Sequence, residues 1–222
     1  MKSIAFLCIF VTLIGCFGCN RGGKNPQSII NSSMELSVVP GENWYGKMKI
    51  FIFSVKKTPQ MAAWIEDDQG HYISTITVTN RSAKNNWRSA PREGRPEALP
   101  VWSHRIQNNM DQIDGVSSAT PKGAIDVNVD NRSLIITQEY RVYLEINHSF
   151  DYNDTWPEKE NDVNGQPSII YYAQFFAGET GRIKLIPIGH GSIDGSDGNI
   201  MQKLEGITTA LTIIKEAYLI IE

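Results

Sequence analysis

The sequence predicts an all-β fold, an antiparallel β-sandwich with at most one short helix. Seven to nine short segments rich in β-branched and aromatic residues follow one another, with turn residues between them. Tyr140–Asn147 alternates strictly between apolar residues and others, as a strand with one buried face does. Gln60–Glu66 and His71–Thr79 flank a turn that ends in Gly70, which indicates a hairpin. No internal repeat divides the chain, so one domain is expected.

The first half of the chain has four expected strands and the single expected helix. Lys47–Val55 has apolar residues on both faces, which indicates a strand covered on both sides. A helix is expected to begin at Pro100, because proline suits the first helical turn, and to reach Asn109. The irregular stretches in this half are expected at 80–99 and 116–123. The four strands are Leu36–Val39, Lys47–Val55, Gln60–Glu66 and His71–Thr79.

The second half is expected to contribute the remaining strands. Tyr140–Asn147 has the alternating pattern, and the two strands after it are apolar and rich in β-formers. The last segment, rich in Ile and Thr, fits one long bent strand or two. Loops are expected at 149–166 and 189–199, where acidic residues, Gly and Ser accumulate. The expected strands are Leu134–Thr137, Tyr140–Asn147, Ser168–Phe176, Arg182–Ile188 and Thr208–Ile221.

Charge and cysteine content exclude several classes of function. The net charge is −3, so no bulk field attracts nucleic acid. The three cysteines, Cys8, Cys16 and Cys19, all lie near the N-terminus. The remaining chain therefore has no disulfide, no Cys metal site and no Cys nucleophile. Gly-x-Ser-x-Gly and the glycine-rich phosphate loops are also missing from the sequence. A carrier or binding protein is favoured over a hydrolase or transferase.

The N-terminus has the pattern of a lipoprotein signal peptide. Lys2 precedes the apolar run Ile4–Ile14, which is too short to cross a bilayer. The run ends in Leu-Ile-Gly-Cys, which resembles the lipobox of bacterial lipoproteins. The resemblance implies cleavage before Cys16 and lipidation of its sulfur, which would anchor the chain to a membrane. We expect residues 1–15 to be a signal peptide, 16–44 to be the lipidated Cys and a tether, and 45–222 to be the sandwich.

Several longer strings resemble a family of uncharacterised bacterial periplasmic proteins, a domain of unknown function. The strings include TPQMAAWIEDDQGHYISTITVT, RPEALPVWSHR, DGVSSATPKG, YLEINHSFDYN, QPSIIYYAQF and, in the last loop, IGHGS and DGSDGNI. The resemblance implies an envelope location, periplasmic or surface-exposed, and an immunoglobulin-like β-sandwich. It also implies a frequent association with flavin-transferase systems.

One short motif indicates a cofactor. The stretch 114–120 fits the pattern D-x-x-[S/T]-[G/S]-A-T and resembles the target sequence of periplasmic flavin transferases. In proteins with that target, the transferase attaches FMN through a phosphoester to the last Thr. The resemblance implies that Thr120 is the acceptor, and it makes a flavin transferase and an envelope redox partner the expected partners. The other residues that match the pattern are Asp114, Ser117, Ser118 and Ala119.

A basic, Trp-containing segment lies just before this motif. It contains Trp87 and Trp102 among six basic residues: Arg81, Lys84, Arg88, Arg92, Arg95 and Arg105. Arg pairs with phosphate and Trp stacks on flat rings, so this segment is a candidate holder of the flavin. The alternative is structural, with exposed loop arginines, a core Trp102 and an Arg95–Glu97 ion pair.

Two other functional classes stay open. A cofactor-free binding or scaffold module would use the loops at one end of the sandwich. A metal-binding domain would use His148, His190 and a nearby carboxylate, since imidazole suits Zn and Cu. Asp151, Asn153 and Thr155 have the early spacing of a calcium loop, but Trp156 stands where that loop needs Gly. The loop 194–199 is a further candidate for calcium.

Overall fold

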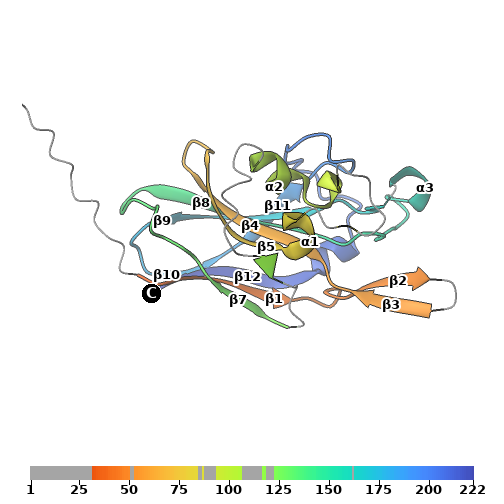
Figure 1. The fold of residues 1–222 in the computed structure, drawn as a ribbon, viewed down its shortest axis with the longest axis horizontal. Helices are drawn as coiled ribbons and strands as arrows, with labels where there is room; N and C mark the ends of the chain where they lie inside the picture. The colour runs from red at the N-terminus through yellow and green to blue at the C-terminus, as the bar shows by residue number, and fades with distance from the viewer. Residues whose placement is uncertain are drawn as a thin grey trace, which may run out of the picture.

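The fold is known from a computed structural model, which describes residues 32–50, 53–84, 87, 94–106, 117–118, 123–161 and 163–222. Two large sheets pack face to face (Figure 1). The four-stranded sheet has the order β10-β12-β1-β7, and the six-stranded sheet has the order β11-β9-β8-β4-β5-β6. Among the described strands, only β5 and β6 pair in parallel. The expected all-β class, an antiparallel β-sandwich, is therefore confirmed.

The four-stranded sheet consists of β1 (Met34–Pro40), β7 (Ile125–Asn128), β10 (Gly181–Lys184) and β12 (Ile214–Ile221). The six-stranded sheet consists of β4 (Gln60–Asp67), β5 (Tyr72–Thr79), β6 (Ser117–Ser118), β8 (Glu139–Asn147), β9 (Ile169–Phe176) and β11 (Ile186–His190). A separate hairpin consists of β2 (Gly46–Ile50) and β3 (Phe53–Lys57). The helices are α1 (Asn80–Ala83), η1 (Pro96–Ala98), α2 (Pro100–Arg105), α3 (Glu158–Asn161) and η3 (Thr209–Thr212).

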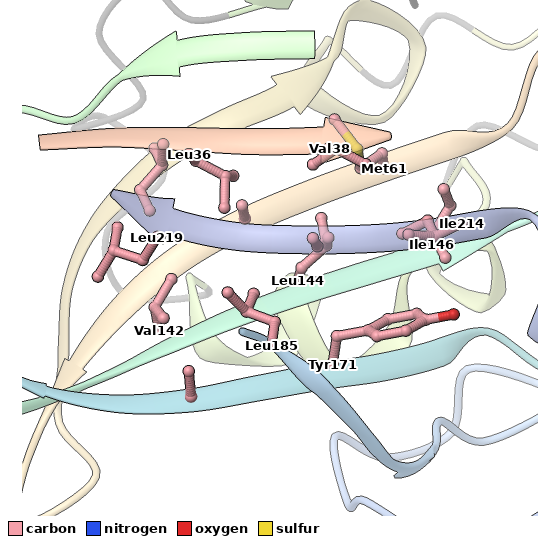
Figure 2. Close-up of a cluster of buried hydrophobic side chains, with 14 of the residues drawn as sticks. Leu36, Val38, Met61, Val142, Leu144, Ile146, Tyr171, Leu185, Ile214 and Leu219 are labelled. Atoms are coloured by element: carbon pink, nitrogen blue, oxygen red, sulfur yellow. The ribbon is translucent and has the colours of Figure 1, made fainter. Parts of the chain in front are cut away.

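The main core lies between the two sheets. Figure 2 shows Leu36 and Leu219 from the four-stranded sheet beside Val142 and Leu144 from the six-stranded sheet. All four side chains are fully buried. Burying an aliphatic side chain of this size stabilises a fold by about 1.5–3 kcal/mol. The alternation read from Tyr140–Asn147 is thus confirmed, because its apolar positions face this core.

A second apolar cluster lies on the outer face of the six-stranded sheet. Here α2 and the residue before it place Leu99, Val101 and Trp102 over Trp64 and Ile170. The other members of the cluster are Ala62, Val78, Ile106 and Tyr143. The six-stranded sheet is therefore covered on both faces over part of its area, which explains why β4 is buried at almost every position.

Several expected boundaries in the first half are corrected. The expected strand Lys47–Val55 is two strands, because Ile50 pairs with Phe53 and the chain turns back between them. The strand expected at Leu36–Val39 extends over Met34–Pro40 and pairs with both β12 and β7. The sandwich therefore begins before residue 45, inside the segment assigned to the tether. The expectation of at most one short helix is wrong, since α1 and α3 form in addition to α2.

In the second half of the chain, the strands are also shorter and more interrupted than expected. Leu134–Thr137 forms turns rather than a strand, and Thr137 has a positive φ of 67°. The expected strand Arg182–Ile188 splits at Leu185, where the chain leaves the four-stranded sheet as β10 and enters the six-stranded sheet as β11. Leu185 is buried in the core at this crossing. The last expected strand starts with η3, so β12 begins only at Ile214.

Candidate functional site

Two residues of the stretch 114–120, which resembles a flavin-transferase target, lie at the edge of the six-stranded sheet. Ser117 and Ser118 form β6, which pairs with Val78 and Thr79 of β5. The sequence had placed them in an unpaired loop, so this is a correction. Asp114, Ala119 and Thr120 lie outside the described residues, as does Cys16. The structure thus fixes where the motif meets the sheet and leaves the acceptor residue a prediction.

Glu145 is a buried carboxyl on β8 that holds α2 against the sheet. Its Oε2 accepts the backbone N–H of Trp102 at 2.8 Å, and its Oε1 accepts that of Val101 at 3.2 Å. The Ser168 hydroxyl donates to Oε1 at 2.6 Å. A Cβ added to Gly191 would lie 2.7 Å from the Ser168 Oγ, so glycine is needed for this close approach. The first turn of α2 therefore has its free N–H groups satisfied by one side chain.

Burial and hydrogen bonding act on Glu145 in opposite directions. Complete burial raises its pKa to about 7, although hydrogen bonds from Ser168, Trp102 and Val101 favour the charged form and limit the rise. Ionising this carboxyl at neutral pH therefore costs the folded state free energy. The group couples the docking of α2 to pH.

We expect this coupling to appear as a loss of stability as the pH rises from about 4.5 to about 7. A carboxyl whose pKa is raised on folding contributes stability below its unfolded pKa, and this contribution is lost as pH rises through the folded value. A rise from 4.5 to about 7 corresponds to about 3 kcal/mol between pH 4.5 and pH 8. Urea unfolding of the wild type and of Glu145→Gln across this range measures it, since the glutamine cannot ionise. A constant difference between the two proteins would contradict the expectation.

Arg95 joins three segments at one end of the sandwich. Its Nε donates to Glu97 at 2.6 Å, and its two other nitrogens donate to Ser149 Oγ at 2.7 Å and Asn164 Oδ1 at 3.0 Å. The guanidinium also lies over the Trp87 ring, 4.9 Å from its centroid. All of its nitrogens are engaged within the chain, so Arg95 has a structural role rather than the proposed phosphate-binding role.

Arg105 and Trp102 are also engaged in packing. The Arg105 Nε pairs with the buried Glu66 at 2.9 Å, and the same carboxyl oxygen accepts the indole N–H of Trp64 at 2.9 Å. The buried Trp102 donates its indole N–H to Thr75 at 3.0 Å.

The other residues of the basic segment are exposed or outside the described residues. Arg81 lies on α1 and Lys84 just after it, and both are exposed. Arg88 and Arg92 lie outside the described residues. α1 contacts both β5 and β6, so the helix that carries Arg81 and precedes Lys84 lies next to β6.

The histidines do not form a metal centre. Within the described ranges, no group of three or more His, Cys, Asp and Glu residues is placed to hold a metal ion. The Nε2 of His148 lies 3.1 Å from the carbonyl oxygens of both Asn43 and Trp44. His190 contacts the Gly191 carbonyl and the edge of Trp156. The candidate set of His148, His190 and a carboxylate is therefore not brought together.

In the two loops considered as calcium sites, the side chains accept hydrogen bonds from backbone N–H groups. Asp194 and Asp197 accept N–H groups two residues ahead, and Asn153 accepts those of Thr155 and Trp156. Asp162, at the twelfth position of the loop that begins at Asp151, lies outside the described residues. These contacts are ordinary loop-stabilising bonds.

Sequence reasoning missed a buried polar cluster at the end of β8. Burial, with Lys57 as a nearby cation, lowers the pKa of His148 to about 4. Burial also lowers the pKa of Lys57 to about 8, and its amine lies 4.8 Å from the centre of the Phe150 ring. Asp151 accepts the Thr209 hydroxyl at 2.7 Å. Because Lys57 comes from β3 and Thr209 from η3, no local pattern in the sequence could bring these residues together.

Comparison with known proteins gives one match. Residues 54–148 match the model of a family described as "Predicted periplasmic protein (DUF2271)". The matched region runs from β3 to the cluster at the end of β8 and includes Glu66, Arg95 and Glu145. No curated protein and no solved structure matches the chain. The family match supports an envelope location. Within the described part of the chain, no helix is long and apolar enough to cross a membrane.

Proposed function

We propose that this chain is an envelope lipoprotein that carries FMN covalently on Thr120 and passes electrons to a redox partner. The observation that carries the proposal is the target motif, Asp114 to Thr120, whose centre lies at a sheet edge. The match to a periplasmic family supports the compartment in which flavin transferases work. When bound, FMN supplies reversible one- and two-electron transfer.

The placement of β6 fits a residue that another enzyme must reach. β6 is the last strand of the six-stranded sheet, and among the described strands it pairs only with β5. Two backbone-paired serines hold the middle of the motif, and Thr120 follows two residues later. Serine is a small residue type, which suits a segment that must enter a transferase cleft. The nearby Arg81 and Lys84 are exposed cations that suit a phosphate group.

The contribution of the chain to the attachment of FMN would come from Thr120. Thr120 would supply the hydroxyl to which the transferase attaches FMN from FAD through a phosphoester, with AMP as the leaving group and loss of the hydroxyl proton. The chain itself needs only to present the hydroxyl and to hold the motif at the edge of the sheet.

We expect the full chain, expressed in a bacterial envelope with a flavin transferase, to be yellow and heavier by one attached FMN. Intact mass and an absorbance spectrum measure both. Thr120→Ala should lose the flavin completely, whereas Ser118→Gly stays within the target pattern and should keep it. Cys16→Ala should keep the flavin and move the chain from the membrane fraction to the soluble fraction. A colourless, unmodified wild type from a host with an active transferase would leave the cofactor-free binding module as the better description.

A further inference from the structure

Asn147, at the end of β8, has a buried amide that no other described residue satisfies. The residue is 2% exposed, and neither its Oδ1 nor its Nδ2 has a hydrogen-bond partner in the described part of the chain. Burying a polar group without a hydrogen bond destabilises a fold, so such groups are rare and usually have a further role. The amide therefore indicates a binding partner rather than a packing role.

The residues on either side of Asn147 are held by the segment that covers the outer face of the six-stranded sheet. Glu145, two residues before it, accepts two backbone N–H groups of α2. Ser149, two residues after it, accepts a hydrogen bond from Arg95 at 2.7 Å. Residues two apart on a strand lie on the same face, so Asn147 lies on the same covered face as Glu145. Its neighbours are thus engaged within the chain, and its own amide is available to another group.

A series of polar residues joins Asn147 to the stretch 114–120. Ser118 of that stretch pairs with Thr79 on β5. The Thr79 hydroxyl donates to Gln60 Oε1 at 2.7 Å, and Gln60 pairs with Asn147 between β4 and β8. Neighbouring strands lie about 4.8 Å apart, so the three spacings from β6 to β8 correspond to about 14 Å. The ribityl chain and the three fused rings of FMN together span a distance of this order.

We propose that Asn147 binds the pyrimidine edge of FMN, an inference that rests on the attachment of FMN to Thr120 proposed above. An asparagine amide has an acceptor and a donor side by side. The pyrimidine edge of the flavin ring has an N–H group flanked by two carbonyl oxygens, which is the complementary pattern. The Asn147 Oδ1 accepts from that N–H group, and its Nδ2 donates to a neighbouring carbonyl. Asparagine uses the same paired contact to read the edge of a nucleobase.

The two hydrogen bonds give Asn147 a positioning role with two measurable effects. They fix the ring against β8, so the attached cofactor stabilises the folded chain. Reduction of a flavin adds negative charge to its pyrimidine ring, and the Nδ2 N–H group stabilises that charge. Removing the amide therefore lowers the reduction potential of the flavin.

A cycle of variants of the full chain, expressed with a flavin transferase, tests this role. The wild type and Asn147→Leu are each compared with the same chain carrying Thr120→Ala, and intact mass counts the attached FMN. In the wild type, attached FMN should raise the melting temperature by about 2–4 °C. Asn147→Leu should lose this rise, and its flavin should have a lower reduction potential. Asn147→Ala repeats the test with a smaller side chain.

Gln174→Leu is the matched control. Gln174 is an exposed residue on β9 of the same sheet, and its amide already donates to Glu139 at 2.7 Å. Its leucine variant should keep both the wild-type potential and the stabilisation by FMN. In the chain with Thr120→Ala, Asn147→Leu should cost no stability, because it removes a buried polar group that has no partner.

Two outcomes would overturn the role of Asn147 alone. In the first, Asn147→Leu carries FMN with the wild-type potential and the wild-type stabilisation. In the second, Asn147→Leu destabilises the chain equally with and without FMN, which would assign the amide to a bound water or to the chain itself. A wild type without attached FMN would contradict the proposed function as well, and its unchanged mass identifies that case.

Discussion

Trp64→Ala is expected to lower the free energy of unfolding by about 4 kcal/mol, the usual size for removing a buried Trp. Trp64 is fully buried on the outer face of the six-stranded sheet. Its ring stacks on Tyr143 with an angle of 12° between the planes, and its indole N–H donates to Glu66. The alanine variant removes the packing of the ring, the stack and one hydrogen bond of a buried carboxylate together.

Chemical denaturation of three variants measures this effect. Trp64→Phe keeps an aromatic ring and should lose clearly less stability than Trp64→Ala. Ile135→Ala, which shortens an apolar side chain that is 51% exposed, should change the free energy of unfolding by less than about 0.5 kcal/mol. If Trp64→Ala lost no more than Ile135→Ala, the cluster under α2 would not be part of the cooperative core.

Arg95→Ala is expected to cost about 3 kcal/mol. Its side chain is only 10% exposed and Glu97 is 21% exposed, so the ion pair is largely shielded from water. Removing the cation leaves Glu97 without its partner, and it leaves Ser149 and Asn164 without a donor. Breaking a buried pair in this way is much more costly than losing a surface pair.

The chain contains a matched control for this experiment. Arg132 and Asp130 also form an ion pair two residues apart, but their side chains are 88% and 58% exposed. Arg132→Ala should therefore change the free energy of unfolding far less than Arg95→Ala does. In a flavinylated preparation, the amount of FMN per folded molecule should be the same in Arg95→Ala as in the wild type. A loss of FMN from a protein that is still folded would instead return Arg95 to the phosphate-binding role suggested by the sequence.

The fold could be predicted from local patterns where apolar residues alternate along a segment or where a glycine-containing turn joins two β-rich segments. β8 and the hairpin of β4 and β5 were found in this way. The pattern failed where the chain changes sheets, because Leu185 lies between two β-rich stretches and no glycine marks the crossing. It also failed at β7, where Ile125–Asn128 is a short strand stabilised mainly by pairing with β1.

The candidate site was less accessible to sequence reasoning. The motif at 114–120 is contiguous, so a pattern could find it. The alternation in β8 places Glu145 on the polar face of the strand. In the structure α2 covers that face, but its contacts with Glu145 join residues more than 40 positions apart, so no local pattern indicates the cover. The arginines of the basic segment suggested ligand binding because their partners, Asn164 and Glu66, lie far from them in sequence. Hydrogen bonds and ion pairs with residues distant in sequence determine the role of these arginines.

The position of β1 inside the four-stranded sheet has a mechanical consequence. Beyond Met34 the chain leads toward the N-terminus, so a force transmitted by an anchor there would pull on β1. This strand lies inside its sheet, paired with β12 on one side and β7 on the other. A pull along β1 loads the hydrogen bonds of both ladders at the same time instead of opening them one after another. The sandwich is thus built to resist traction at the end from which a tether would leave.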